Sequence, residues 1–317
     1  RLNYLRLASD PADAGLDPLS SVSPEMFVPF RFQSEQLVYD NEDYGSWSFL
    51  FSPSETGGDI KELSARVKGM EIDLPETFQW TNIPGQESTT FTGAIRVPEL
   101  GNTLEAWGYA AGLEGQGFNF QSRLKWSGSP LNVGIENLSG QLSIKGGKGR
   151  IVQVEANSSP LKLLGIFDFA EIAKRFSLDF TGLLAEGHSF NSVTGGVTMY
   201  DGSIDVTEPI VIVGAGSQFT LAGNLDLVSE KIDTDLIVTL PVNKNLPWYA
   251  AYTAFATGPI TAAGVFLAQK IFKKQIRDMT SLKYEILGTL AEPEVKFVSM
   301  FDASVRALPE QSTEAQQ

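Results

Sequence analysis

The sequence predicts a mainly β protein with a few helices. Three observations support this fold class. Apolar and polar residues alternate along most of the chain, dipeptides typical of tight turns separate the alternating runs, and few segments have helical periodicity. The composition is that of a folded protein, because 42% of the 317 residues are hydrophobic and 20% are charged. A chain of this length can form one long domain or two of ordinary size.

Alternation with period two begins at Phe30 and returns repeatedly as far as Leu240. Such alternation is typical of strands that have one apolar face. From Val193 onward it predicts a meander of short antiparallel strands, separated by turns at Asp201-Gly202 and Gly223-Asn224. Asp201-Gly202 is the clearest hairpin turn in the chain.

Three segments are candidate helices. Leu100–Tyr109 is short, and Pro160–Phe176 follows Ser159 as N-cap and has one apolar face, as in a helix that covers the end of a sheet. The third segment spans residues 246–277. We place an organisational boundary near Pro160, between a β-rich segment (1–159) and a C-terminal region (160–307). The polar tail, residues 308–317, is expected to be disordered.

The third segment contains no charged residue between Lys244 and Lys270. It is long enough to span a bilayer, but Gly258-Pro259 would break a helix, which favours a broken hairpin or an interfacial helix. Aromatic residues precede basic ones, as membrane interfaces select. A buried core helix with a basic last turn fits equally well. The predicted membrane-contacting residues are Trp248, Tyr249, Tyr252, Phe255, Phe266, Lys270, Ile271, Phe272, Lys273, Lys274 and Arg277.

Composition and charge argue against several function classes. A formal net charge of -14 opposes binding to nucleic acid. The absence of cysteine excludes disulfides, thiolate metal sites and cysteine nucleophiles, and the single histidine, His188, has no triad motif around it. The glycine-rich runs at 112–117 and 146–149 lack nucleotide-binding spacing and indicate turns. We therefore expect no enzymatic activity and no cofactor.

Three carboxylates, Asp226, Asp233 and Asp235, are the best candidates for a glycosidase or calcium site. They lie at alternating strand positions, which a solvated sheet face fills with the same residues. We interpret them as part of a solvated face and expect no metal site.

Many weak markers occur in one order between Pro160 and Phe297. They are Leu178–Phe180 (LDF), Gly187, Phe190, the Asp201-Gly202 hairpin, Gly223–Leu227 (GNLDL), Tyr284, Gly288 and Pro293. In this order they resemble the C-terminal region of the YhdP-type AsmA-like proteins, a family of bridge-like lipid transfer proteins. Leu2–Leu7 (LNYLRL) and Ser127–Ile151 are similar to the family's preceding strands, so that the resemblance covers almost the whole chain.

The resemblance implies a long curved antiparallel sheet that forms an open apolar groove. Phospholipid would move along it between the inner and outer membranes of a Gram-negative bacterium. The chain would be the distal part of an inner-membrane-anchored protein that crosses the periplasm and reaches the outer membrane. Its implied partners are phospholipid, the membrane and an envelope protein.

Apolar alternation is cleanest at six positions, which we predict to line the groove. They are Val197, Met199, Phe219, Leu221, Leu225 and Leu227. An ordinary core between a sheet and a helix would use the same residue types, and β-bulges leave strand parity undecided. The alternative function is a non-enzymatic envelope module that docks a protein partner and carries no lipid.

Overall fold

The computed structural model describes residues 1–7, 17–109, 111–152, 188–241, 279–290, 293–300 and 304. These residues form one sheet of 17 strands, one α-helix, α1 (Leu100–Ala106), and two short 3-10 helices, η2 (Pro24–Met26) and η3 (Ile135–Asn137). The predicted mainly β class is confirmed, and α1 lies within the predicted helical segment Leu100–Tyr109. The other two predicted helices and the C-terminal tail lie outside the described residues.

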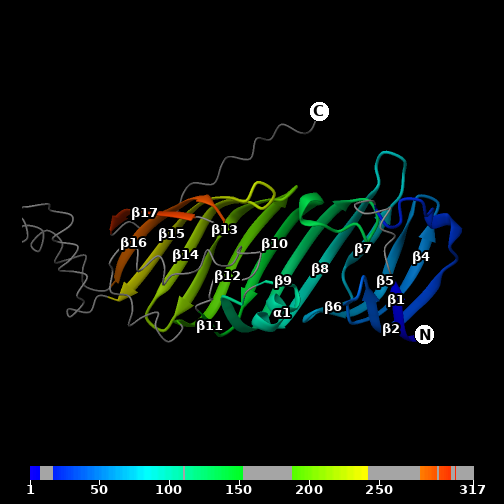
Figure 1. Cartoon of the computed structure of the whole chain (residues 1–317), viewed down its shortest axis with the longest axis horizontal. Helices are drawn as coiled ribbons and strands as arrows, with labels where there is room; N and C mark the ends of the chain where they lie inside the picture. Colours follow the sequence, from blue (N-terminus) through cyan, green and yellow to red (C-terminus); the bar gives the residue numbers. More distant parts are fainter. Residues whose placement is uncertain are drawn as a thin grey trace, which may run out of the picture.

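The strands follow one another side by side along the long axis of the molecule (Figure 1). The first nine are β1 (Leu2–Leu7), β2 (Phe30–Tyr39), β3 (Glu42–Asp43), β4 (Ser46–Ser54), β5 (Gly57–Val67), β6 (Met70–Asp73), β7 (Thr77–Thr81), β8 (Ser88–Glu99) and β9 (Leu113–Ser127). The others are β10 (Leu138–Gly146), β11 (Gly149–Ile151), β12 (His188–Tyr200), β13 (Ser203–Gly214), β14 (Gln218–Asp226), β15 (Lys231–Pro241), β16 (Met279–Thr289) and β17 (Pro293–Met300).

Strands pair almost entirely with their neighbours in sequence, and every pair is antiparallel except β1 with β2. Each of three positions in the sheet is shared by two strands: β3 and β4 both lie beside β2, β6 and β7 lie between β5 and β8, and β10 and β11 lie between β9 and β12. At about 4.8 Å per step, the sheet extends for roughly 60 Å. Strands from both sides of the predicted boundary near Pro160 belong to this one sheet.

The two edges formed by the strand ends differ in their connections. One edge, here called the α1 edge, carries α1 between β8 and β9 (lower side of Figure 1). Because strand directions alternate, the end of β11, the start of β12, the end of β15 and the start of β16 lie at this edge too. Most connections at the opposite edge are short turns, such as Asp201-Gly202 between β12 and β13.

The predicted hairpin at Asp201-Gly202 is confirmed. Tyr200 pairs with Ser203, and the two turn residues have φ values of +45° and +84°, as a type I′ turn requires. The predicted turn at Gly223-Asn224 is wrong, because both residues lie inside β14. At Gly223 a Cβ would lie 2.3 Å from the carbonyl oxygen of Asp233, so the close approach of β15 explains this glycine.

The turn after β14 instead spans residues 227–230. A carboxylate oxygen of Asp226 accepts hydrogen bonds from the backbone N–H groups of Ser229, at 2.7 Å, and Val228, at 3.0 Å. These hydrogen bonds favour the ionised form and lower the pKa of Asp226, the bond from Ser229 contributing most. Asp226 therefore has a structural role as the cap of this turn.

The register separates the residues of the sheet into two faces. One face, the apolar face, carries most of the buried hydrophobic residues of the sheet. The other, the polar face, carries ion pairs between neighbouring strands, such as Arg66 with Glu71 at 3.4 Å and Arg31 with Glu62 at 2.6 Å. These pairs are exposed, and they contribute little to stability because water screens them.

One ion pair on the polar face is buried. The ammonium of Lys283 on β16 lies 3.1 Å from the carboxylate of Asp235 on β15, and their side chains are 13% and 6% exposed. Lys283 also donates a hydrogen bond of 3.1 Å to the backbone oxygen of Ser304. Ala222 and Ile237 are buried nearby on the same face. The expectation that Asp235 belongs to a solvated face is therefore wrong, because this part of the polar face is covered.

Replacing the buried lysine should destabilise the fold. We expect Lys283→Met to lower the free energy of unfolding by about 3–5 kcal/mol, because a buried carboxylate loses its counter-charge. Urea denaturation followed by circular dichroism measures the change. The matched control is Lys296→Met on β17, whose exposed pair with Glu294 spans 3.5 Å. Its effect should stay within about 1 kcal/mol, and equal effects of the two substitutions would contradict the assignment of a buried pair.

Candidate functional site

The candidate site is the apolar face, which continues across the sheet without interruption by charged residues in its central row. Residues paired directly across neighbouring strands point to the same side of a sheet, so the pairings trace this row from β7 to β17. It consists of Phe78, Phe91, Leu124, Gly140, Met199, Ile204, Leu225, Ile232, Gly288 and Pro293. A single apolar path therefore joins strands more than 200 residues apart in the chain.

Further apolar rows run parallel to this one on either side. On β14 and β15, Phe219 pairs with Val238 and Leu221 pairs with Leu236, and all four side chains are at most 8% exposed. The rows pack into three clusters, the largest of which reaches from β8 to β17. Leu100 of α1 joins this cluster, so the helix covers the apolar face at the α1 edge.

The end of the face near β2 is aromatic and more exposed. Phe32 stacks on Phe49 with ring centroids 5.1 Å apart, and Phe30 lies 5.4 Å from Phe51. Phe27, which follows η2, meets the ring of Phe51 edge-on at 5.7 Å. From β12 onward the face consists mostly of Val, Ile and Leu. The face thus changes from aromatic to aliphatic along its length.

From β12 to β16, the buried aliphatic residues of the apolar face are each at most 8% exposed. They are Val193, Val197, Val206, Ile212, Leu221, Ile232, Leu236, Val238, Leu282 and Ile286.

The structure brings together all six residues predicted to line a groove. Val197 and Met199 lie on β12, and Phe219, Leu221 and Leu225 lie on β14, all on the apolar face. Leu227 follows β14 and packs against the largest cluster, which contains Phe219 and Leu221. Their contact with lipid stays a prediction. The predicted membrane-contacting residues, between Trp248 and Arg277, lie outside the described residues.

The prediction missed the first half of the apolar face. Trp80, Phe91, Phe118 and Trp126 are all at most 6% exposed and lie on the same side of the sheet as the six predicted residues. Their alternation is visible in the sequence. The sequence does not reveal that β10 pairs with β12, although residues 147–187 separate these strands in the chain. This pairing brings the two halves of the apolar face into register.

In the part of the chain that the structure describes, no three His, Asp or Glu side chains are grouped so as to hold a metal ion. Asp233 and Asp235 lie on the polar face of β15, and Asp226 caps a turn. Within the same residues, no helix has the length and apolar character needed to cross a membrane.

Tyr284, on the apolar face of β16, is 2% exposed. Burial disfavours the phenolate and raises the pKa of the Tyr284 hydroxyl well above its usual value. The hydroxyl is neutral at physiological pH, as that of any ordinary tyrosine is, and burial keeps it neutral at more alkaline pH as well. The face keeps its uncharged character even where a titratable residue belongs to it.

Comparisons with known proteins agree with the sequence resemblance. The model of the family described as "YhdP protein" matches residues 1–295. A curated relative, the "Intermembrane phospholipid transporter YhdP" of Escherichia coli (strain K12), is 24% identical over 220 residues, which cover 69% of this chain and 17% of the relative. This chain therefore matches only a small part of that protein's length. No solved structure matches the chain. Because the family model matches nearly the whole chain, the chain belongs to the YhdP family.

Proposed function

We propose that this chain binds the acyl chains of phospholipids along its apolar face and forms part of a path for phospholipid between two membranes. The observation that carries this proposal is the unbroken apolar row from Phe78 to Pro293. Family membership supports it, since the curated relative is named an intermembrane phospholipid transporter. The ligand class is phospholipid, and the activity is transport without a chemical reaction.

The energetics of such a face suit lipid movement. Removing an acyl chain of about 16 carbons from water is worth on the order of 10 kcal/mol, at about 0.8 kcal/mol per methylene. One chain covers about half of a 30 Å hydrocarbon core, so a face of roughly 60 Å has length for several lipids. Successive positions along the face offer similar apolar contacts. A lipid can therefore move between them with little net change in free energy.

We infer that the sheet curves into an open groove with the apolar face inside. Sheets twist and coil, and the ends of the strands can then approach one another while the charged face stays in water. Headgroups would remain at the open side. In this arrangement the chain is the distal part of a longer, inner-membrane-anchored protein in the periplasm of a Gram-negative bacterium, where it reaches toward the outer membrane.

Photocrosslinking tests the contact with lipid. With p-benzoylphenylalanine in place of Phe120 or Phe219, which lie on the apolar face, we expect crosslinks to phospholipid when the protein is expressed in a Gram-negative host. The matched control is the same substitution at Gln121, the exposed neighbour of Phe120 on the polar face. Lipid extraction and mass spectrometry identify the adducts. Equal labelling at Phe120 and Gln121 would contradict a lipid path on the apolar face.

Native mass spectrometry of the purified chain, prepared without detergent, gives an independent measurement. Copurified phospholipid at a defined stoichiometry supports the proposal. A monodisperse chain that is empty of lipid would favour the alternative function, an envelope module that docks a protein partner.

We also propose that residues 246–277 contact a membrane, with the aromatic residues in the interface and the basic residues near anionic headgroups. Replacing Lys270, Lys273, Lys274 and Arg277 together by Gln should weaken binding to liposomes containing phosphatidylglycerol. At about 1 kcal/mol per basic residue, the expected loss exceeds a hundredfold. Flotation measures it, with phosphatidylcholine liposomes as the uncharged control. Unchanged flotation would refute this contact.

A further inference from the structure

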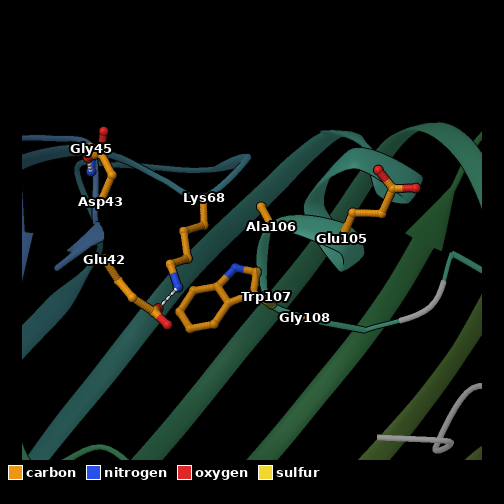
Figure 2. Close-up of a pocket in the computed structure, with 8 residues that line it drawn as sticks. All are labelled: Glu42, Asp43, Gly45, Lys68, Glu105, Ala106, Trp107 and Gly108. Carbon is orange, nitrogen blue, oxygen red and sulfur yellow. Dashed lines mark hydrogen bonds and ion pairs between the residues drawn. The ribbon is translucent and has the colours of Figure 1, made fainter. Parts of the chain in front are cut away.

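A cavity of about 610 Å³ lies at the α1 edge, beside the apolar face. Three segments form it: the corner between β3 and β4, the turn between β5 and β6, and the end of α1 (Figure 2). Its lining residues are Glu42, Asp43, Gly45, Lys68, Glu105, Ala106, Trp107 and Gly108. Trp107 and the neighbouring Tyr44 also pack against the buried cluster of Leu63, Ala65 and Val67. The cavity is therefore polar on one side and continuous with the apolar face on the other.

Two glycines hold the walls of this cavity close together. Gly45 has φ +67°, and a Cβ there would lie 2.0 Å from the carbonyl oxygen of Arg66. Gly69 has φ +86°, and a Cβ there would lie 2.4 Å from Oγ1 of Thr103 in α1. The β5–β6 turn thus packs directly on the helix. This contact fixes Lys68 between the β3–β4 corner and Trp107.

Lys68 is held by aromatic rings and by a carboxylate. Its Nζ lies 4.7 Å from the ring centroid of Tyr44 and 5.0 Å from that of Trp107, and it forms an ion pair with Glu42. The side chain is 11% exposed. An ammonium group has three donors, so the pair with Glu42 leaves donor capacity at Lys68.

Trp107 supplies a second donor. Its Nε1 atom is buried and has no hydrogen-bond partner among the described residues. Figure 2 shows this nitrogen on the side of the ring that faces Lys68 and Ala106. Buried N–H groups are normally satisfied, so an indole donor at a cavity wall indicates an acceptor supplied from outside the chain. Two neighbouring donors, one of them charged, suit a phosphate oxygen.

The acidic side chains around the cavity restrict which phosphate fits. Glu42, Asp43 and Glu105 contribute three carboxylates against the single ammonium of Lys68. Asp43 is fixed by hydrogen bonds of 2.7 Å from the backbone N–H of Gly45 and from Nε2 of Gln36. This excess of negative charge opposes a purely anionic headgroup and favours one that also carries an ammonium.

We propose that the cavity binds a phosphoethanolamine group, carried by a phospholipid whose acyl chains lie on the adjacent apolar face. The phosphate accepts hydrogen bonds from Lys68 Nζ and Trp107 Nε1, and the ethanolamine ammonium pairs with Glu42 and Asp43. The proposal rests on the proposed function, since it names the headgroup of the same lipid. It makes this end of the sheet selective for zwitterionic aminophospholipid over anionic phospholipid.

The test uses the full chain and measures headgroup selectivity separately from total lipid binding. The delipidated protein is incubated with vesicles of equimolar dioleoyl-phosphatidylethanolamine and dioleoyl-phosphatidylglycerol, which have the same acyl chains. Native mass spectrometry then gives the total bound lipid and the ratio of the two. We expect the wild-type chain to prefer phosphatidylethanolamine by about tenfold, the usual size of one charge-assisted hydrogen bond.

The decisive variant is Glu42→Gln, which keeps the shape of the side chain and removes the charge that pairs with the ethanolamine ammonium. It should bring the ratio close to one, because both lipids carry the phosphate and only phosphatidylethanolamine carries the ammonium. Trp107→Phe removes a donor to the phosphate of either lipid, so it should leave the ratio in place. The matched control is Glu62→Gln on the polar face, where Glu62 forms an exposed ion pair with Arg31. This control should retain the preference.

The outcomes separate this inference from the proposed function. A wild-type chain that binds no lipid overturns the proposed function together with the headgroup site. A chain that binds both lipids equally, or whose preference survives Glu42→Gln, overturns the headgroup site alone. Titration with soluble glycerophosphoethanolamine, followed by calorimetry, distinguishes the source of the group. We expect far weaker binding than to the lipid, and equal affinity would overturn the assignment to a phospholipid.

Discussion

The register between neighbouring strands is the constraint on which the rest of this structure depends. Side chains alternate between the faces with a period of two, so a slip of one residue in any pair would move a charged row into the apolar face. The row from Phe78 to Pro293 stays apolar although the register shifts elsewhere in three of the strand pairs that it crosses, β12–β13, β13–β14 and β16–β17. The register also shifts between Ser48 and Leu50. Apolar residues remain paired on both sides of this shift, Trp47 with Ala65 and Phe51 with Ile60.

The two faces of the sheet follow different energetic rules. The apolar face is stabilised by burial, which is non-directional and tolerates a change from aromatic rings near β2 to mostly aliphatic side chains on β15. The polar face relies on exposed ion pairs, except where Asp235 and Lys283 are covered. A single burial pattern therefore serves both the stability of the sheet and the proposed contact with lipid. Residues that fill the face would also line the proposed path for lipid.

Much of the fold could be predicted from the sequence, because its signals are local. Alternation identified the strands, and Asp-Gly at 201–202 identified the hairpin, since a type I′ turn needs two residues with positive φ. The same reasoning failed at Gly223, where glycine reflects the close approach of β15 rather than a turn. A lone sequence does not distinguish these two causes.

The candidate site was predicted only in its second half, for a physical reason. Val197 and Phe219 alternate cleanly within their own strands, whereas the continuity of the face depends on pairings between strands that are distant in sequence. The burial of Asp235 likewise depends on Lys283, 48 positions later in the chain. The cavity around Lys68 requires three segments to meet, and neither Tyr44 nor Trp107 stands in a motif that would reveal it.

Pairing between sequence neighbours has a consequence for how such a protein can change in size. Each hairpin depends mainly on the strands beside it, as in solenoid proteins, where stability is close to a sum of units and of the contacts between adjacent units. A hairpin inserted between two existing ones would lengthen the sheet and leave the packing of the distant strands unchanged. The length of the sheet can therefore change in steps of about 10 Å, two strand spacings. In a sheet of this kind, duplication or loss of a hairpin can change the length of the sheet without changing the packing of the other strands.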